Sequence, residues 1–574
     1  MRNVLAGSGL FAFFLGWNAP NHYPPWPAFH LEFLAAVGLC LIGAAACLDP
    51  GHTRSPLSPA VPRLRMSWAS RLWLLVAAIP LLQLLTGTLV FRGDALLGML
   101  YAMGVGLGIY IGQLWVARQG RRQVMTTLWL TLLFSGLAAD GLALVQWLRL
   151  PNPGWWAMEL IDDRPYANFA QPNHFGLAMV FSIVAATALF EMSLIRSRWV
   201  YAQCVVFLGW GILMSQSRAS ALALVAVAVL WLATRSRLPT RLRLSDLAIA
   251  AAAALLLGLA ILPLEHLLGL AATEVRATPD LGPRQWIWLH FWAAIAEHPW
   301  WGYGFNQGVR ALAEVAPAVH PSRNVTFAHN VVLDLMTWAG IPLALLMSLG
   351  LVLWMLGWLR KGPDVKLATQ RHWVFAIWLA LLIQSLLEFP YAHTYFLLPA
   401  VLLAGAVTGS GLGVPAPTRV RADPMAAVLA LVAVALLGVT GWEYFRMEDD
   451  FRYNRFAHAN FIGRPDHEAL ETPWLLDQLG ALNASAKLPA RAGMSADELA
   501  RMRMLARRFH IISTRLDYAR ALALNGRLAE AEAELVIVRS VCPPQQWAKV
   551  HRQWDSWLAS HPAGAPRPQA PGDP

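Results

Sequence analysis

Long apolar runs recur along the first 440 residues of the chain, and several reach the roughly 20 residues that a helix needs to cross a bilayer. Of the 574 residues, 57% are hydrophobic and 14% are charged. Soluble domains carry roughly 25% charged residues, so this composition points to a lipid environment. The pattern predicts an all-α polytopic membrane protein, with a transmembrane helix bundle over residues 1–442.

The apolar runs define about 13 transmembrane helices. The first of them, Val4–Trp17, has no small-residue cleavage site before Asn18, so we expect a membrane helix and not a removable signal peptide. The expected spans lie near 4–17, 31–48, 72–90, 95–116, 124–148, 176–195, 199–214, 219–234, 247–268, 331–358, 373–389, 395–410 and 425–442.

The connections between these spans alternate in basic content. The chain has a net charge of +11, but its Arg and Lys residues form short clusters between apolar runs, which indicates topology and no nucleic-acid partner. One set of alternate connections holds 19 basic residues and the other holds eight. The positive-inside rule predicts that the first set and the N-terminus are cytoplasmic. The C-terminal domain then lies outside, which is the periplasm if the membrane is a bacterial inner membrane.

Two long loops, 149–175 and 269–330, fall on the outer side together with the tail. Residues 443–560 regain charged residues and helical spacing, so we expect a soluble helical domain. Its segment Tyr518–Leu535 resembles a tetratricopeptide-type (TPR-like) hairpin, although a generic helical hairpin fits equally well. The Pro- and Ala-rich residues 561–574 are expected to be disordered. A hypothesis for the domain is that it holds a second protein beside the membrane part.

Polar residues gather in the outer segments. In the first cluster, 162–176, the side chains of Arg164, Gln171, Asn173 and His174 offer hydrogen-bond donors to a polar or anionic substrate. The alternative is a solvated loop in which Asn173 caps the following helix.

Two arginines stand out in the next outer segments. Arg218 follows Ser215-Gln-Ser at an outer turn, and its depth near the bilayer favours binding of a lipid-linked phosphate. Snorkelling to the interface is the alternative. Arg284 precedes a Trp-rich stretch that is typical of an interfacial helix, and the Trp residues need no other explanation.

Two more clusters flank later spans. His329 lies at the outer N-terminus of a predicted helix, where free amides favour anions, and Asn330 is a candidate cap. Glu388 lies just inside the outer end of another span, before Pro390, Tyr391 and Tyr395. The four cysteines have no metal-type spacing, so neither a disulfide framework nor a zinc site is expected.

Several of these strings resemble one bacterial family. Arg164-Pro-Tyr-Ala-Asn-Phe-Ala-Gln-Pro-Asn-His174 is similar to the "GN…QPNH" stretch of PglL-type protein O-oligosaccharyltransferases, with Ala167 where Gly is usual. Ser215–Arg218, Arg284–Gly304 and His329–Asp334 resemble the core of the Wzy/O-antigen ligase superfamily. The resemblance covers residues 150–400 and implies a GT-C-like helix bundle.

The implied reaction is transfer of a preassembled oligosaccharide from undecaprenyl pyrophosphate to a Ser or Thr hydroxyl of an exported, pilin-like protein. By resemblance, His329 is the essential histidine, and Arg218 and Arg284 bind the pyrophosphate. The remaining candidates shape the glycan and acceptor cavity: Arg164, Gln171, Asn173, His174, Glu388, Tyr391 and Tyr395. No cofactor is implied. In the outer loops, no dense carboxylate cluster other than Asp162-Asp163 suits a divalent metal, which predicts metal-independent catalysis.

Three alternatives remain at this point. An O-antigen ligase or Wzy-type polymerase would use the same donor with another acceptor. A secondary transporter would show internal repeats and broken helices at the bilayer midplane, and no such repeat is evident. An assembly protein would use its membrane part only as an anchor, for which thirteen spans are excessive.

Overall fold

The computed structural model describes residues 1–48, 63–151, 154–161, 163–270, 284–319, 325–360, 364–409, 420–458, 461, 473–485, 488–509, 512–542 and 544–560. These residues are helical wherever they form regular structure, and their β interactions amount to one isolated bridge between Arg63 and Arg421. The predicted disordered tail, 561–574, lies outside the described residues. The all-α prediction is confirmed.

Every predicted span coincides with a helix or with two consecutive helices. They are α1 (Arg2–Asn18), α2 (Phe29–Cys47), α3 (Trp68–Val76) with α4 (Ala78–Leu85), α5 (Arg92–Gln119), α6 (Arg121–Trp147), α7 (Pro172–Glu191), α8 (Arg198–Ser215), α9 (Arg218–Thr234), α10 (Leu244–Leu267), α13 (Val331–Ala339) with α14 (Ile341–Gly357), α15 (Val365–Ser385), α16 (Thr394–Gly409) and α17 (Pro424–His458).

Seven of the described helices are long and apolar enough to cross a membrane by length and composition. The hydrophobic helix α10 shows the reason most clearly, because it leaves Leu255, Leu256 and Leu259 exposed and buries only Glu265. An exposed apolar surface of this kind is stable against lipid and not against water. The protein is therefore a multi-pass membrane protein, and the full count of thirteen crossings stays a prediction.

The remaining helices are α11 (Arg284–Glu297), α12 (Gly308–Val315), the 3-10 helix η1 (Pro390–Ala392), α18 (Asp477–Ser485), α19 (Ala496–Phe509), α20 (Ile512–Leu524), α21 (Leu528–Val541) and α22 (Pro544–Ala559). The chain divides into two compact units. Unit 1 comprises Met1–Ala77, Leu100–Thr278 and Gly350–Gly438, and unit 2 comprises Ala78–Met99, Pro279–Leu349 and Val439–Pro574. The linear domain boundary at 442 remains a prediction.

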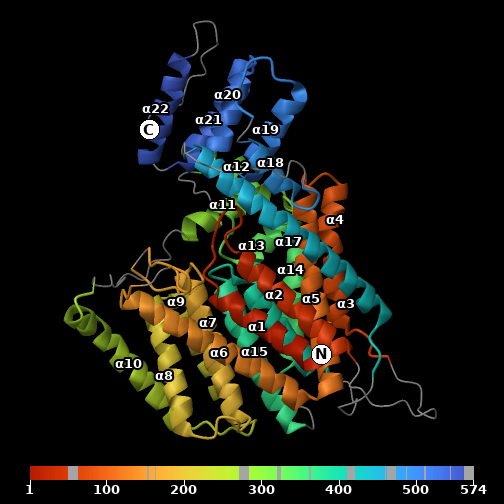
Figure 1. Cartoon of the computed structure of the whole chain (residues 1–574), viewed down its shortest axis with the longest axis vertical. Coiled ribbons are helices and arrows are strands. Elements are labelled where there is room, and N and C mark those ends of the chain that lie inside the picture. Colours follow the sequence, from red (N-terminus) through yellow and green to blue (C-terminus); the bar gives the residue numbers. More distant parts are fainter. Residues whose placement is uncertain are drawn as a thin grey trace. The chain divides into compact units, whose positions relative to one another are not determined.

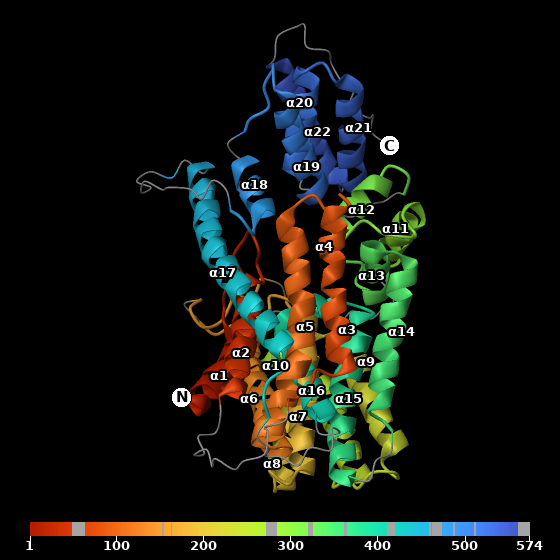
Figure 2. The same ribbon diagram turned by 90° about the vertical axis from the view of Figure 1, so that its right-hand side faces the viewer.

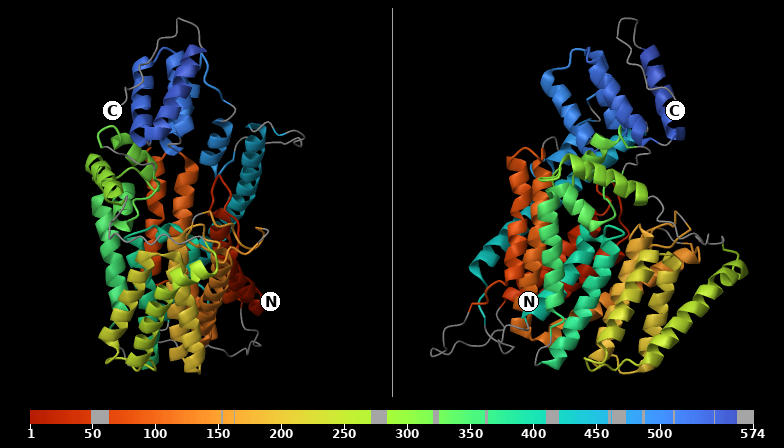
Figure 3. Two further views of the ribbon diagram at one scale, coloured as in Figure 1. Left: turned by 90° about the vertical axis from the view of Figure 1, so that its left-hand side faces the viewer. Right: turned by 180° about the vertical axis from the view of Figure 1, so that it is seen from behind.

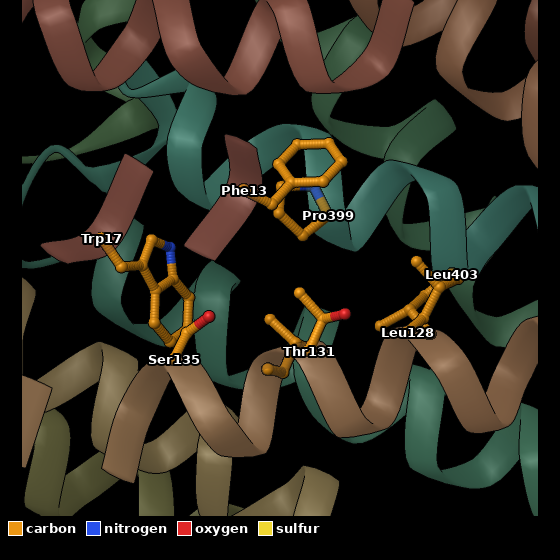
Figure 4. Close-up of a pocket in the computed structure, with 8 residues that line it drawn as sticks. Phe13, Trp17, Leu128, Thr131, Ser135, Pro399 and Leu403 are labelled. Carbon is orange, nitrogen blue, oxygen red and sulfur yellow. The ribbon is translucent and has the colours of Figure 1, made fainter. Parts of the chain in front are cut away.

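In unit 1, α7 is the central helix, because it packs against α6, α8, α9 and α15 (Figure 1). Seventeen of its residues are buried. Helix α10 packs against α8 at the edge of this group (Figure 3). Helices α1, α6 and α16 enclose a small apolar cavity of about 10 Å³ lined by Phe13, Trp17 and Pro399 among others (Figure 4). It has room for about one water, so the core here is closely packed.

In unit 2, the C-terminal helices form antiparallel neighbours (Figure 2). Helices α20 and α21 pack through small residues, including Ala519, Ala523 and Ala531, each of which is almost completely buried. The segment with the predicted hairpin is therefore a helical hairpin. Helix α19 precedes this hairpin and packs against α20.

Candidate active site

In unit 1, the first and fifth polar clusters join in one hydrogen-bond network. Asn173 Nδ2 donates to Glu388 Oε1 at 2.7 Å, and Gln171 Nε2 lies 3.5 Å from Glu388 Oε2. Arg164 donates to Asn173 Oδ1 at 3.3 Å and to the Ser215 carbonyl at 2.7 and 2.9 Å. Glu388 is only 2% exposed. The network thus places a buried carboxylate and a guanidinium on the two sides of one amide.

The alternative in which Asn173 caps α7 is wrong. The helix begins at Pro172, and Gln171 occupies the N-cap position without a side-chain cap hydrogen bond. Proline favours the first helical position because its missing N–H is not needed there and its φ is already helical. Asn173 therefore lies inside the first turn, and its amide group is available to bind Glu388.

Small residues let α7 approach the turn between α8 and α9. A Cβ added to Gly176 would lie 2.5 Å from Ser220 Oγ and 3.0 Å from Ser215 Oγ. Gln384 links the two segments, since its Nε2 donates to the Asn173 carbonyl at 2.9 Å and its Oε1 accepts from Ser220 Oγ at 3.4 Å. The approach brings Ser217, the N-cap of α9, and the exposed Arg218 that follows it to the same end of the unit as the network.

Beside the network lies a ring cluster that includes His174 and Tyr395. The Tyr395 hydroxyl and His174 Nδ1 lie 3.2 Å apart, and the His393 ring stacks on Tyr395 with ring centroids 5.0 Å apart. His393 Nδ1 is 3.0 Å from Glu32 Oε1. Tyr391 lies in η1, between Glu388 and His393 in the sequence, and is half-buried. The cluster gives His174 and Tyr395 fixed orientations.

The left-handed backbone at Ala167 explains the glycine usual at this place in the family pattern. Its φ is +51°, a region that costs most side chains about 1–2 kcal/mol. Gln146 stabilises the turn, because its Oε1 accepts from the N–H groups of Tyr166 and Ala167. Alanine is therefore tolerated in this chain.

In unit 2, hydrogen bonds hold both the N–H and the carbonyl of Ala328, the residue before His329. Both carboxylate oxygens of Asp334 accept from the Ala328 N–H, at 3.0 and 3.1 Å. Trp288 Nε1 donates to the Ala328 carbonyl at 3.0 Å. His329 itself is half-buried and has a φ of +53°, a strained conformation of the kind that persists where surroundings hold it. The backbone that carries its imidazole is thus held by Asp334 and Trp288.

Arg284 begins α11, and His329 lies two residues before α13, which packs against α11. Arg284 is the first residue of α11, and Asn330 caps α13 by accepting from the N–H groups of Val332 and Leu333. The packing of α11 on α13 is apolar and includes Phe291 and Ala328. The predicted cap and the predicted Trp-bearing helix are both present. The remaining amides of α13 make its N-terminus electropositive beside His329.

The sequence analysis assigned no role to Asp334, Trp288 or Gln384. In the structure, Asp334 and Trp288 bind the backbone beside His329, and Gln384 binds the backbone of Asn173. The Gly302-Tyr-Gly304 string is structural, since a Cβ at Gly302 would lie 2.4 Å from the Thr337 carbonyl oxygen. In the described part of the chain, no three His, Cys, Asp or Glu side chains gather as metal ligands would.

Replacing Asp334 with Asn is expected to lower the turnover of the enzyme about tenfold to a hundredfold, since misplacing a catalytic group by about 1 Å can cost a hundredfold. The amide removes one of two acceptors for the Ala328 N–H. With the role for His329 that the resemblance implies, kcat should fall while KM for the donor stays within about twofold. An unchanged kcat would rule out this positioning role.

Replacing Glu388 with Gln is expected to raise KM for the lipid-linked donor about tenfold, since a hydrogen bond to a charged group contributes roughly 1.5–3 kcal/mol. The amide cannot accept from both Asn173 and Gln171 as the carboxylate does. Steady-state kinetics on purified protein measures the change, and the exposed Glu297→Gln is the matched control. Equal KM values in both variants would contradict a substrate-binding role for the network.

The fold is that of a polytopic membrane protein, and two stretches of the chain match known families. Residues 203–348 match the family model described as O-antigen ligase, and residues 372–554 match the one described as virulence factor membrane-bound polymerase, C-terminal. A protein named general O-oligosaccharyltransferase from Acinetobacter baylyi is 30% identical over 409 residues, covering 68% of each chain. A ComP-specific O-oligosaccharyltransferase from the same organism is 30% identical over 123 residues, covering 21% of this chain and 22% of the relative. The chain belongs to the O-oligosaccharyltransferase family.

Proposed function

We propose that the protein transfers a preassembled oligosaccharide from undecaprenyl pyrophosphate to Ser or Thr hydroxyls of exported, pilin-like proteins. The observation that carries the proposal is the 30% identity over 409 residues to a general O-oligosaccharyltransferase. Oligosaccharide transfer is the activity that the names of the relatives give. The proposal adds the donor lipid, the hydroxyl acceptor and the pilin-like partner. The acceptor distinguishes it from an O-antigen ligase or polymerase.

The reaction needs a base for the acceptor and positive charge for the leaving group. The acceptor oxygen attacks the anomeric carbon, the bond from that carbon to the pyrophosphate oxygen breaks, and undecaprenyl pyrophosphate leaves with the bonding electrons. We assign the acceptor proton to the His329 imidazole, because a neutral imidazole is a competent base near pH 7. Charge that develops on the leaving group is stabilised by fixed cations, and Arg218 and Arg284 fill this role.

The network in unit 1 serves substrate recognition. Gln171 Oε1 is buried and makes no hydrogen bond within the described residues, so it is an acceptor for a sugar hydroxyl. Arg164, Asn173 and Glu388 hold the segment that carries it. We assign His174, Tyr391 and Tyr395 to the walls of the glycan and acceptor cavity.

The proposed location is the bacterial inner membrane, with the N-terminus in the cytoplasm and the C-terminal domain in the periplasm. The uneven distribution of basic residues between alternate connections supports this orientation. A periplasmic site suits exported acceptors, since they reach that compartment unfolded or newly folded. A reporter that works only outside the cytoplasm should be active when it is fused after residue 458. A reporter that works only in the cytoplasm should be inactive at the same position.

An in-cell assay tests the function. A host that supplies one lipid-linked glycan and a tagged pilin-like acceptor would express the wild type, His329→Ala or Arg218→Ala at equal membrane levels. The acceptor should gain the mass of the glycan with the wild type alone. If the acceptor stays bare while the lipopolysaccharide ladder changes, the function is that of a ligase or polymerase.

Chelation is expected to leave the transfer rate unchanged, because the proposal assigns charge stabilisation to arginines and the α13 N-terminus. Purified enzyme would be assayed in EDTA and again after addition of Mg²⁺ or Mn²⁺. A rate that is lost in EDTA and returns with either ion would require a metal in the mechanism.

A further inference from the structure

A large cavity lies at the opposite end of α7 and α15 from the Glu388 network. Its volume is about 990 Å³, comparable with pockets that hold small ligands. The end of α7, the start of α6 and the start of α15 contribute to its wall, as does the connection from Pro239 to Arg241. Helix α7 has 20 residues and rises about 1.5 Å per residue, so the cavity and the network are separated by roughly 30 Å.

The cavity wall carries four basic side chains: Arg121, Arg122, Arg241 and Lys366. Its two carboxylates already have partners. Asp364 forms an ion pair with Arg121 at 2.8 Å and caps α15, while Glu191 accepts from the N–H of Arg241 and from Thr240.

Two of the four basic side chains have no carboxylate partner among the described residues. Arg122 and Lys366 are exposed and have no ion pair with any part of the chain that the structure describes. The wall therefore offers positive charge that no carboxylate among the described residues neutralises, and an anion is the complementary ligand.

Two buried polar atoms of the wall have no hydrogen-bond partner among the described residues. Trp129 is fully buried, and its Nε1–H donates no hydrogen bond within the described residues. Gln370 is 8% exposed, and its Oε1 accepts none there. A buried unsatisfied polar group costs about 1–3 kcal/mol, which a ligand with both an acceptor and a hydroxyl would offset.

We propose that this cavity binds a phosphate-bearing anion. A phosphate oxygen accepts from the guanidinium of Arg122, the ammonium of Lys366 and the Trp129 indole, and a hydroxyl of the same ligand donates to Gln370 Oε1. The chemistry is shared by the headgroup of an anionic phospholipid such as phosphatidylglycerol and by a soluble phosphate ester such as glycerol 3-phosphate. This site is separate from the glycan-transfer site, and it stands whichever acceptor the enzyme uses.

Binding would be measured on the full-length protein purified in detergent at about 0.15 M salt, with native mass spectrometry of phosphatidylglycerol adducts. The variant Arg122→Ala/Lys366→Ala should bind phosphatidylglycerol about 30-fold more weakly, since each basic residue near a lipid headgroup is worth about 1 kcal/mol. The control Arg196→Ala/Arg237→Ala removes two exposed charges from connections at the same end of the unit but outside the cavity wall. It should stay within about threefold of the wild type.

A second variant tests the cavity without changing charge. Gln370→Met keeps the side-chain volume and removes the acceptor, so phosphatidylglycerol binding should weaken several-fold while phosphatidylcholine binding stays the same. Glycerol 3-phosphate, added without lipid, identifies the source of the anion. If it binds with the same variant dependence and phosphatidylglycerol does not, the ligand is soluble. If neither phosphatidylglycerol nor glycerol 3-phosphate binds the wild type more tightly than the two cavity variants, the proposal is overturned.

Discussion

His329→Ala is expected to reduce glycan transfer to the acceptor protein by a factor of about 100 or more, with membrane levels unchanged. Removing a general base typically costs a factor of about 10² to 10⁴. His329 is held by α13 and α11 through the two hydrogen bonds to Ala328, so it has the rigid support that a catalytic group needs. Initial rates of transfer from a purified lipid-linked glycan would measure the loss.

The control for this substitution is His266→Ala, which removes an exposed histidine at the end of α10. It should retain at least half of the wild-type rate. A His329→Ala enzyme that is correctly folded and transfers glycan at the rate of the control would remove His329 from the mechanism.

Arg508→Met is expected to lower the free energy of unfolding by about 3–5 kcal/mol, the usual cost of leaving one charge of a buried pair without its partner. Arg508 Nε and Nη2 each donate to a carboxylate oxygen of Asp94 at 2.7 Å, and both side chains are largely buried. In the variant, Asp94 would keep the hydrogen bond from Gln307 at 3.1 Å. Denaturant unfolding in detergent would measure the change.

Two further variants check the cause. Arg501→Met removes an exposed arginine from the same helix, α19, and should change stability by less than about 0.5 kcal/mol. Asp94→Leu/Arg508→Met removes both charges and should recover most of the stability, as buried pairs replaced by apolar residues often do. A double variant as unstable as Arg508→Met alone would show that the ion pair is not the cause.

This ion pair also changes how the role of the C-terminal domain is tested. Deleting residues 450–574 would remove the partner of Asp94 and the contacts of Asp477 with the N–H groups of Arg92 and Gly93. Lost activity would then reflect lost stability within unit 2. Substitutions on the exposed faces of α19–α22 are the better test of the hypothesis that this domain positions the acceptor protein.

The helices were predictable from the sequence because apolar runs of membrane length have few alternatives. Their ends were less so. The span predicted at 373–389 is the helix Val365–Ser385, since Asp364 caps it and the polar residues of its first turns are still helical. The span predicted at 425–442 is the first part of α17, which continues to His458. The charged residues after 442 are typical of a soluble domain, so the sequence predicts a boundary inside this helix.

The candidate residues were predictable in identity but not in their connections. The link between Arg164 and the Ser215 carbonyl, or between Glu32 and His393, joins segments that no local pattern relates. The Asp334 bonds to the Ala328 N–H are local, and a carboxylate six residues after a backbone turn could have suggested them. Long-range pairs depend on how α2, α7, α9 and α15 pack, which periodicity alone does not determine.

The most direct test of the central claim uses purified protein, a lipid-linked oligosaccharide and two acceptors, a pilin-like protein and a lipid A core. The products would be analysed by intact mass and by mapping of the modified residue. The account predicts that the whole glycan appears on a Ser or Thr of the protein and that undecaprenyl pyrophosphate is released in equal amount. Glycan found on the lipid A core, with the protein unmodified, would contradict it.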